Sequence, residues 1–512
     1  MATRPPPRAA AITVCVTTLI RPAQDADAGP GTTGRQLPGT PFGLWMWPAL
    51  ATLACTLTGI RGPLLGTDEI VTWDVAERST ARILAMLHRV DAVHGTYYLL
   101  MHGWTALFGS SHTSLRMPSA LAMAATAAVV TLIGRRLFGE RAGLCGGVLF
   151  AVVPVVSRYG QEARSYALVV LAATVATLLL LRAFDRPRSW GRWAAYSACL
   201  AVVGLLHLVA LTVVAGHLAA VLLRARRRRR ELWCFLAAAA VGGACAAPVI
   251  LLGRSQASRQ LFWVPEPDLW ALAGIWPQVF ASSLCAGAVV TLAALAGKER
   301  REALLPCAAL VVVPPLVLWA ASHGDVSYFR FQYVMFTVPH WAVLAGAGLA
   351  AAARSWRVVA VVLAALSLLV LPDQRRMREP FEHDVPHGAD YAGAARTIEK
   401  YHRPGDGVVY VRGGPWMLDR GVRYYLGRDP ELREVFLARS AAENDELYPA
   451  YCTQPARCLR GESRIWVVVP GTGPDPLESV PAVQARVLRA QYTTYGTERL
   501  SGLTVALLQR KS

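Results

Sequence analysis

Charged residues are scarce in this sequence. Only 17% of its 512 residues are charged, and lysine occurs just three times, at Lys298, Lys400 and Lys511. Mean hydropathy is +0.35 and 54% of the residues are hydrophobic. A chain this apolar is not an ordinary soluble enzyme. The sequence also lacks the Gly-x-x-x-x-Gly-Lys-Ser/Thr loop with which many proteins bind nucleotide phosphates. It therefore shows no sign of a P-loop that would use a nucleotide as the source of energy.

The charges that are present are mostly arginines, and they give a formal net charge of +18. They stand in short clusters between long apolar runs and do not form one continuous basic face. This distribution argues against nucleic acid as a partner and is typical of the cytoplasmic loops of a multi-pass membrane protein. We therefore expect a polytopic α-helical protein of the cell membrane.

Apolar runs of about membrane-spanning length recur through most of the chain. A helix needs roughly 20 apolar residues to cross about 30 Å of hydrocarbon. Eleven candidate crossings meet or approach this length: 42–60, 117–133, 144–156, 166–181, 193–206, 208–223, 232–252, 269–295, 303–321, 333–351 and 356–371. We expect about 11–13 transmembrane helices in a domain of residues 42–371. The apolar stretch 96–109 is short for a crossing, so its topology stays open.

The basic loops indicate the orientation of these crossings. The strongest marker is the arginine run 224–231, and the basic loops 134–141, 182–192, 297–302 and 353–357 fall on the same, cytoplasmic side. A disordered cytoplasmic tail, 1–41, precedes the first crossing. The first outer loop, 61–95, then faces the other side of the membrane, together with everything after residue 371.

Beyond residue 371 the composition becomes that of a soluble protein. Apolar runs with the periods of helices and strands alternate, which predicts a small extracytoplasmic α/β domain over 372–512. Cys452 and Cys458 lie in this domain. They would form a disulfide in an oxidising compartment or stay a free pair, and the sequence leaves both options open.

Three sequence-distant clusters of polar residues share the expected outer side. The first is the acidic pair Asp68 and Glu69. The second lies at the start of a crossing, and the third is Arg330 among aromatic residues. The members of the second cluster are Arg158, Gln161, Glu162, Arg164 and Tyr166. Taken singly, each cluster is also explained as solvated loop residues, a structural ion pair or interfacial aromatics. Together they provide a carboxylate base and arginines that bind phosphate.

Four segments of the sequence resemble a known superfamily. "GTDE", "YYLLMHGWTALFGSSHTSLRMPSAL", "GRRLFGERAG" and "SRYGQEARSYAL" are similar to segments of the GT-C glycosyltransferases that use polyprenyl-phosphate sugars. The likeness is greatest to bacterial relatives of protein O-mannosyltransferases and to aminoarabinose transferases of lipid A, the glycosyltransferase family 39 type. It is best over 59–182 and looser over the rest of the membrane part.

The resemblance implies a membrane enzyme that transfers a sugar such as mannose or arabinose from a polyprenyl-phosphate donor to an acceptor hydroxyl. The acceptor is a protein, a lipid or a cell-envelope glycan. Asp68 takes the position of the catalytic base, with Glu69 beside it, and Asp91 and His94 are candidates for an acceptor or metal site. "DAVHGTYY", which contains Asp91 and His94, departs from the "PPLYY"-like form of many relatives.

The arginines of the outer clusters, Arg158, Arg164 and Arg330, would face the donor phosphate, with Gln161, Glu162 and Tyr166 beside them. The resemblance also implies that a divalent metal could be bound, as in some members of the superfamily. The acids of the first outer loop, together with His88 or His94, would be its ligands. Two other classes of protein fit the crossings: a transporter or lipid flippase of glycan precursors, and a scaffold with an outer module. A transporter predicts paired repeats with polar sites near the membrane midplane, and we find no internal repeat.

Overall fold

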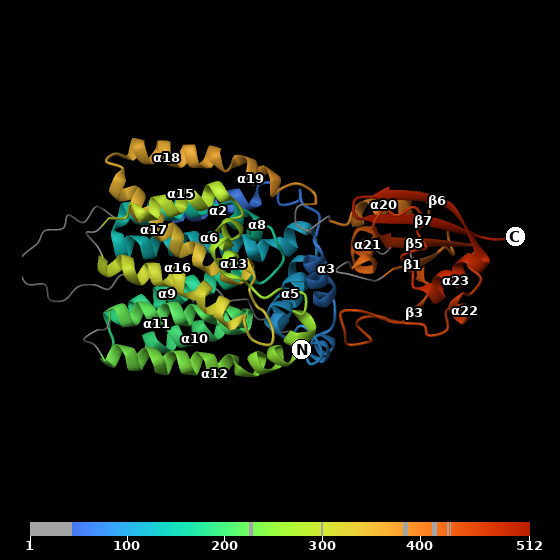
Figure 1. The fold of residues 1–512 in the computed structure, drawn as a ribbon, viewed down its shortest axis with the longest axis horizontal. Coiled ribbons are helices and arrows are strands. Elements are labelled where there is room, and N and C mark those ends of the chain that lie inside the picture. The colour runs from blue at the N-terminus through green and yellow to red at the C-terminus, as the bar shows by residue number, and fades with distance from the viewer. Residues whose placement is uncertain are drawn as a thin grey trace, which may run out of the picture. The chain divides into compact units, whose positions relative to one another are not determined.

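The computed structural model describes residues 43–224, 229–297, 301–381, 388–411, 417–427, 430 and 432–512. The expected tail, 1–41, lies outside these residues. Leu44–Ser512 form one compact unit that contains both a helical part and a mixed sheet (Figure 1). The fold is therefore the expected one, a helical membrane protein with a small C-terminal α/β domain.

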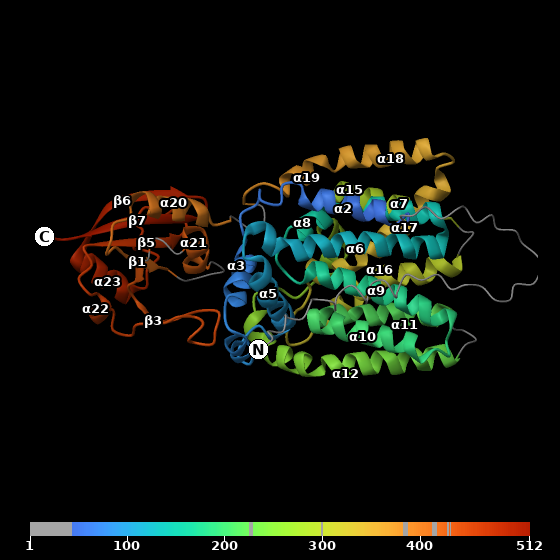
Figure 2. The same ribbon diagram turned by 180° about the vertical axis from the view of Figure 1, so that it is seen from behind.

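The helical part begins with one helix, then a layer of short helices, then the main bundle. Its elements are α2 (Met46–Leu57), α3 (Thr67–Ala76), α4 (Thr80–Leu87), η1 (Ala92–His94), α5 (Gly95–Phe108), α6 (His112–Phe138), α7 (Glu140–Val152), α8 (Pro154–Gly160), α9 (Tyr166–Asp185), α10 (Trp190–Leu206), η2 (Leu208–Thr212), α11 (Val213–Arg224), α12 (Arg229–Gln260), α13 (Leu269–Ala273), α14 (Ile275–Phe280), α15 (Ser283–Ala294), α16 (Arg301–Ala321), η4 (Phe331–Thr337), α17 (Val338–Ala352), α18 (Trp356–Leu369) and α19 (Leu371–Arg376). In both views of the ribbon, α10, α11 and α12 lie side by side (Figures 1 and 2).

Fewer helices than expected are long and apolar enough to cross a membrane. Among the described residues there are five, or six if α7 and α8, which meet at a bend of 62°, are one span. Three of the four shorter apolar helices coincide with other expected crossings, and the fourth, Ser283–Ala294, covers only part of one. The expected single crossing 269–295 is wrong. It is divided into α13, α14 and α15, because Ala281 has a left-handed backbone (φ 54°) and Ser282 caps the next helix.

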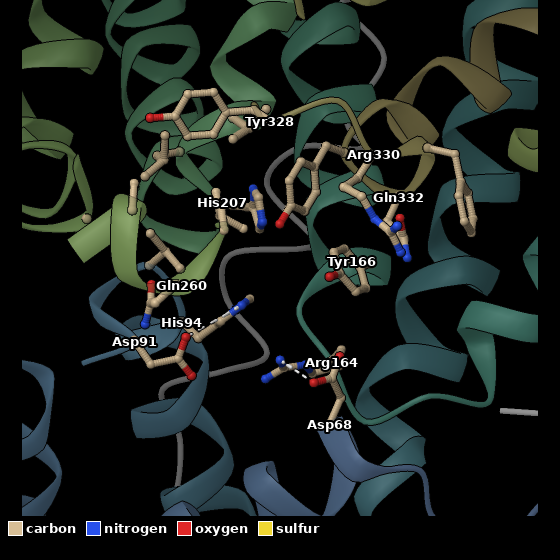
Figure 3. Close-up of a pocket in the computed structure, with 18 of the residues that line it drawn as sticks. Asp68, Asp91, His94, Arg164, Tyr166, His207, Gln260, Tyr328, Arg330 and Gln332 are labelled. Atoms are coloured by element: carbon tan, nitrogen blue, oxygen red, sulfur yellow. Dashed lines mark hydrogen bonds and ion pairs between the residues drawn. The ribbon is translucent and has the colours of Figure 1, made fainter. Parts of the chain in front are cut away.

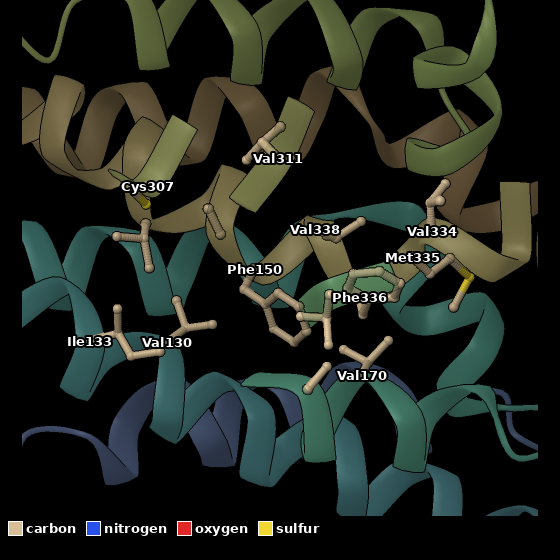
Figure 4. Close-up of a cluster of buried hydrophobic side chains, with 14 of the residues drawn as sticks. Val130, Ile133, Phe150, Val170, Cys307, Val311, Val334, Met335, Phe336 and Val338 are labelled. Atoms are coloured by element: carbon tan, nitrogen blue, oxygen red, sulfur yellow. The ribbon is translucent and has the colours of Figure 1, made fainter. Parts of the chain in front are cut away.

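Close packing of helix backbones holds the bundle together. Gly346 of α17 lies directly against Gly146 of α7, so a Cβ atom at Gly346 would stand 2.6 Å from the carbonyl oxygen of Ala142. Small residues allow such an approach where lipid replaces water and no hydrophobic force drives helices together. Beside this contact, a buried cluster joins residues of α6, α7, α9, α16, η4 and α17, among them Val130, Phe150, Val170, Val311 and Phe336 (Figure 4).

The stretch 96–109, whose topology the sequence leaves open, corresponds to α5. This helix has 14 residues and packs against α3 and α4. At 1.5 Å per residue it is about 21 Å long, which is shorter than the hydrocarbon thickness. Among the described elements, α5 therefore belongs to the layer of short helices and is not one of the long spans.

The C-terminal part is a five-stranded mixed sheet with helices on both faces. Its elements are α20 (Tyr391–Tyr401), β1 (Gly407–Tyr410), α21 (Leu418–Leu426), β2 (Arg433–Glu434), β3 (Leu437–Arg439), β4 (Ala450–Tyr451), α22 (Pro455–Cys458), β5 (Arg464–Pro470), α23 (Ala482–Gln491), β6 (Tyr492–Leu500) and β7 (Leu503–Arg510). The strand order is β2-β1-β5-β7-β6; β1 pairs in parallel with β2 and β5, and β7 pairs antiparallel with β5 and β6. Cys452 and Cys458 form a disulfide, with Cα atoms 6.7 Å apart.

Alternate residues of the central strands face two separate cores. Trp466 and Val468 of β5 pack with α20, α21 and the short helices of the first loop, whereas Val467 of the same strand packs with α23. Polar contacts reinforce the first of these cores. The guanidinium of Arg420 lies 3.2 Å from the carboxylate of Asp74 on α3. The C-terminal part and the helix that carries Asp68 thus share one core.

Candidate functional site

A cavity of about 2290 Å³ lies where α3, η1, α8, α12 and η4 meet. Figure 3 shows polar side chains from these distant segments around it, including Asp68, His94, Arg164 and Arg330. The expectation that Asp68 and Arg164 share one cavity is confirmed. This size exceeds that of many small-molecule sites, so there is room for a substrate larger than a single sugar.

Asp68 stands in the first turn of α3, where a carboxylate is stabilised by the partial positive charge of the helix N-terminus. Its Oδ1 accepts a hydrogen bond of 2.9 Å from Nη2 of Arg164. The Arg164 side chain is 8% exposed, whereas that of Asp68 is 55% exposed. The pair therefore leaves the carboxylate accessible from the cavity while a buried guanidinium holds it in place.

The same guanidinium connects Asp68 to a second acid. Nη1 of Arg164 donates to the hydroxyl of Tyr98 over 3.2 Å, and that hydroxyl in turn donates to Oδ2 of Asp91. His94 lies beside Asp91, with Nε2 4.0 Å from Oδ1. Burial lowers the pKa of His94 to about 3, and the nearby Arg164 adds to the effect. The imidazole is therefore neutral at physiological pH and carries one donor and one acceptor nitrogen.

Glu69 follows Asp68 directly but has a different environment. Its buried carboxylate accepts two hydrogen bonds of 2.8 Å from Nε and Nη2 of Arg116 on α6. It also accepts from the backbone N–H groups of Gly66 and Ala163, at 3.1 and 2.9 Å. Glu69 thus ties the first turn of α3 to α6 and to the segment that carries Arg164.

The second sequence cluster divides into two sets of side chains. Arg158 donates to Glu162 over 3.0 Å, and both line the cavity. Burial raises the pKa of Glu162 to about 7, although Arg158 opposes the rise. Gln161 is not among the lining residues; it is buried, and its amide donates to the carbonyl oxygens of Thr56 and Thr58.

Aromatic residues surround the remaining candidates. Tyr166 lines the cavity and meets Tyr159 edge to face, with ring centroids 5.4 Å apart. The guanidinium of Arg330 lies 4.8 Å from the centre of the Trp263 ring. No carboxylate among the described residues forms an ion pair with Arg330. Its charge is therefore available to an anion in the cavity.

Sequence reasoning missed several residues of this site. Arg116, Tyr98, Gln260 and Trp263 are not among the sequence-based candidates. Gln260 and Trp263 line the cavity, whereas Arg116 and Tyr98 bind the carboxylates of Glu69 and Asp91. A signal for Arg116 existed, because an arginine inside an apolar helix is costly and persists where it has a partner or a function.

The described residues offer no fitting cage for a metal ion. Within the described ranges, no group of three or more His, Cys, Asp and Glu side chains is placed to hold one. Asp68 is paired with Arg164, and Asp91 accepts from Tyr98. We therefore derive no chemical step through a metal.

Comparisons with known proteins agree on the type of fold. Residues 96–251 match the family model "Dolichyl-phosphate-mannose-protein mannosyltransferase". A search of curated proteins finds no match. The solved structure of ArnT from Cupriavidus metallidurans bound to undecaprenyl phosphate is similar over 90% of this chain and 97% of that chain, with 16% identity and a TM-score of 0.61.

Two further solved structures are similar. ArnT from the same organism in the apo state, also with 16% identity, again covers 90% of this chain and 97% of that chain, with a TM-score of 0.58. An Archaeoglobus fulgidus oligosaccharyltransferase is more distant, with 12% identity over 83% of this chain and 69% of that chain and a TM-score of 0.48. The likeness to the two ArnT structures shows that the chain has a GT-C fold.

Proposed function

We propose that the protein is a membrane glycosyltransferase that transfers a sugar from a polyprenyl-phosphate donor to an acceptor hydroxyl. The observation that carries the proposal is the accessible carboxylate of Asp68, held by Arg164 inside a cavity that also contains the available guanidinium of Arg330. The GT-C fold and the bound undecaprenyl phosphate of the similar ArnT structure support a lipid-phosphate donor.

In the proposed reaction Asp68 is the general base. It takes the proton of the acceptor hydroxyl as the acceptor oxygen forms a bond with the anomeric carbon of the sugar. The bond between that carbon and the phosphate oxygen breaks in the same step, and the electron pair leaves with the lipid phosphate. A single displacement of this kind inverts the anomeric configuration. Because phosphate is a good leaving group, no separate general acid is required.

The arginines of the cavity have different roles in the proposed reaction. Arg330 binds the phosphate and stabilises the charge that develops on it as the bond breaks. Arg164 already donates to Asp68 and Tyr98, so we assign it to positioning the base. Arg158 also lines the cavity, where it is paired with Glu162.

Glu69 has a positioning role in this account. Arg116 and the backbone N–H groups of Gly66 and Ala163 hold its buried carboxylate, so we assign Glu69 to fixing the first turn of α3. Tyr166 lines the cavity and contributes an aromatic surface for a sugar ring. Gln161 stabilises the end of α2 through its two backbone contacts.

For the sugar and the acceptor we propose only chemical classes. The family-model description and the likeness to ArnT support mannose or an arabinose-like sugar as the transferred group. The acceptor hydroxyl belongs to a protein, a lipid or a cell-envelope glycan. Residues Met417, Leu447 and Tyr448 of the C-terminal part line the cavity, so we assign that part to shaping the acceptor side.

We also propose that the cavity and the C-terminal domain lie outside the cytoplasm. Helix α6 carries Arg116, which binds Glu69, near its start and Arg136, which pairs with Asp185, near its end. At 1.5 Å per residue these arginines are about 30 Å apart, the thickness of the hydrocarbon layer. The basic loops that contain Arg136 and Asp185 therefore lie across the membrane from Asp68, as the positive-inside rule requires.

The test of this function uses membranes that contain the protein and a panel of radiolabelled polyprenyl-phosphate sugars. We expect label to move from at least one donor to an acceptor with the wild type and not with Asp68→Asn. Membranes without the protein are the background control. Movement of an intact labelled donor across the bilayer, with no transfer from any donor, would instead indicate a transporter.

A further inference from the structure

One corner of the cavity differs in chemistry from the part that contains the guanidinium groups of Arg158 and Arg330, which we call the cationic wall. There the carboxylate of Asp91, the imidazole of His94 and the amide of Gln260 face the cavity together (Figure 3). We infer that this corner binds the hydroxyl groups of the transferred sugar, a role that rests on the proposed function.

The corner is held rigidly against α12. Gln256 accepts a hydrogen bond from the backbone N–H of Ala92 and donates to the carbonyl oxygen of Leu87, both at 2.9 Å. It therefore fastens the chain on both sides of Asp91. A Cβ atom at Gly253 would lie 2.7 Å from Cγ1 of Val93, so the loop approaches α12 as closely as a glycine permits. A rigid site loses little entropy when a ligand binds.

His94 has hydrogen-bonding capacity left for a ligand. The residue is 7% exposed, and among the described residues its Nδ1 has no hydrogen-bond partner. A buried polar atom without a partner is costly, and a ligand hydroxyl would satisfy it. Sugar hydroxyls both donate and accept, which matches a neutral imidazole next to a carboxylate.

The negative charge of Asp91 separates this corner from the phosphate position. A lipid phosphate beside Asp91 would be repelled, whereas a sugar carries no charge that the carboxylate opposes. Aromatic rings continue the wall: His207 lies 5.7 Å from His94 and 4.5 Å from Tyr333, measured between ring centroids. Such rings pack against the C–H faces of a sugar.

Hydrogen bonds place the corner relative to the base. Asp91 is connected to Asp68 through Tyr98 and Arg164, so the two carboxylates flank one buried guanidinium. A donor with its sugar hydroxyls at Asp91 and its phosphate at Arg330 would lie in the same cavity as Asp68, since all three side chains line it (Figure 3). The corner and the cationic wall thus bind different parts of one donor.

The test compares two ligands on purified protein in lipid nanodiscs. The first is undecaprenyl phosphate, and the second is the tightest-binding member of a set of its mannosyl, glucosyl and arabinosyl derivatives. The measured quantity is the ratio of their dissociation constants. For the wild type we expect the sugar to improve binding roughly tenfold, the effect of about one hydrogen bond to a charged group.

Two variants test the corner one side chain at a time: Asp91→Asn removes the carboxylate, and His94→Ala removes the imidazole. In each we expect the ratio to fall to about one to two, while undecaprenyl phosphate itself binds within about twofold of the wild type. The exposed Asp475→Asn, which also removes a carboxylate, is the matched control and should keep the wild-type ratio.

A ratio that stays at the wild-type value in both variants would overturn the inference alone. A wild type that binds undecaprenyl phosphate but gains nothing from any sugar would do the same. Absence of undecaprenyl phosphate binding to the wild type would overturn the proposed function, and the inference with it.

Discussion

Arg116 holds the carboxylate of Glu69 with two parallel hydrogen bonds of 2.8 Å, and both side chains are almost completely buried. The next residue toward the N-terminus, Asp68, is exposed to the cavity. One acid of the adjacent pair thus fixes the backbone, and the other is presented to substrate. This division explains why two neighbouring carboxylates stand at the start of α3.

Removal of Arg116 should destabilise the protein strongly. Arg116→Ala leaves the Glu69 carboxylate buried without its cation, and breaking a buried pair from one side costs about 3–5 kcal/mol. We expect a large fall in the melting temperature of the detergent-solubilised protein. Arg136→Ala, on the same helix, removes an arginine from a partly exposed pair and should cost less than about 1 kcal/mol. Equal melting temperatures for the two variants would contradict this assignment.

The raised pKa of Glu162 should make the stability of the protein depend on pH. Because its pKa is raised from 4.5 to about 7, the folded state binds the proton more tightly than the unfolded state. The resulting stability is present below about pH 4.5 and is lost as the pH rises through 7. The Glu162→Gln variant does not lose this stability, because a glutamine side chain does not ionise.

The variant should therefore gain stability relative to the wild type between pH 4.5 and 8, by about 3 kcal/mol at most. Melting curves recorded across this range provide the measurement. Parallel pH profiles for the two proteins would show that Glu162 is not perturbed in this way.

Two glycine substitutions should have opposite effects on stability. Gly346→Ala forces α17 away from the backbone of α7 and should destabilise by about 1–3 kcal/mol. Gly243→Ala on α12 meets no atom within 4 Å and should stabilise by up to about 1 kcal/mol, because alanine favours the helix. Thermal unfolding of both variants tests this; a neutral Gly346→Ala would mean that the two helices are not in backbone contact.

Chelation should leave the reaction unchanged. Asp68, Asp91 and Glu162 are paired with Arg164, Tyr98 and Arg158, respectively, so we expect guanidinium groups to supply the positive charge of the site. We expect transfer rates in EDTA to stay within about twofold of the untreated protein, a loss of less than about 0.4 kcal/mol in transition-state stabilisation. Loss of activity that Mg²⁺ or Mn²⁺ restores would establish a metal requirement that this account does not contain.

The sequence predicted the fold class and the grouping of the main charges, for identifiable physical reasons. Arginine-rich loops alternate with apolar runs, and this alternation places Asp68, Arg164 and Arg330 on one side. In the C-terminal part, β5 is a continuous apolar run because both of its faces are buried. The edge strand β6 is mostly exposed and has no such pattern, so hydropathy alone does not indicate it.

Other features depend on contacts that periodicity does not encode. Gln161 and Glu162 are adjacent, yet one bonds to α2 and the other lines the cavity, because the chain turns between α8 and α9. The partner of Arg116 lies 47 residues away in sequence. Hydropathy over 269–295 also did not show the break at Ala281, where the backbone adopts a left-handed conformation.

The most direct test of the account is the rate of sugar transfer by purified Asp68→Asn, with donor binding measured on the same sample. We expect a fall of about 10²–10⁴-fold in the transfer rate, the usual contribution of a general base, with donor affinity nearly unchanged. Transfer at the wild-type rate by this variant would show that Asp68 is not the base and would contradict the proposed mechanism.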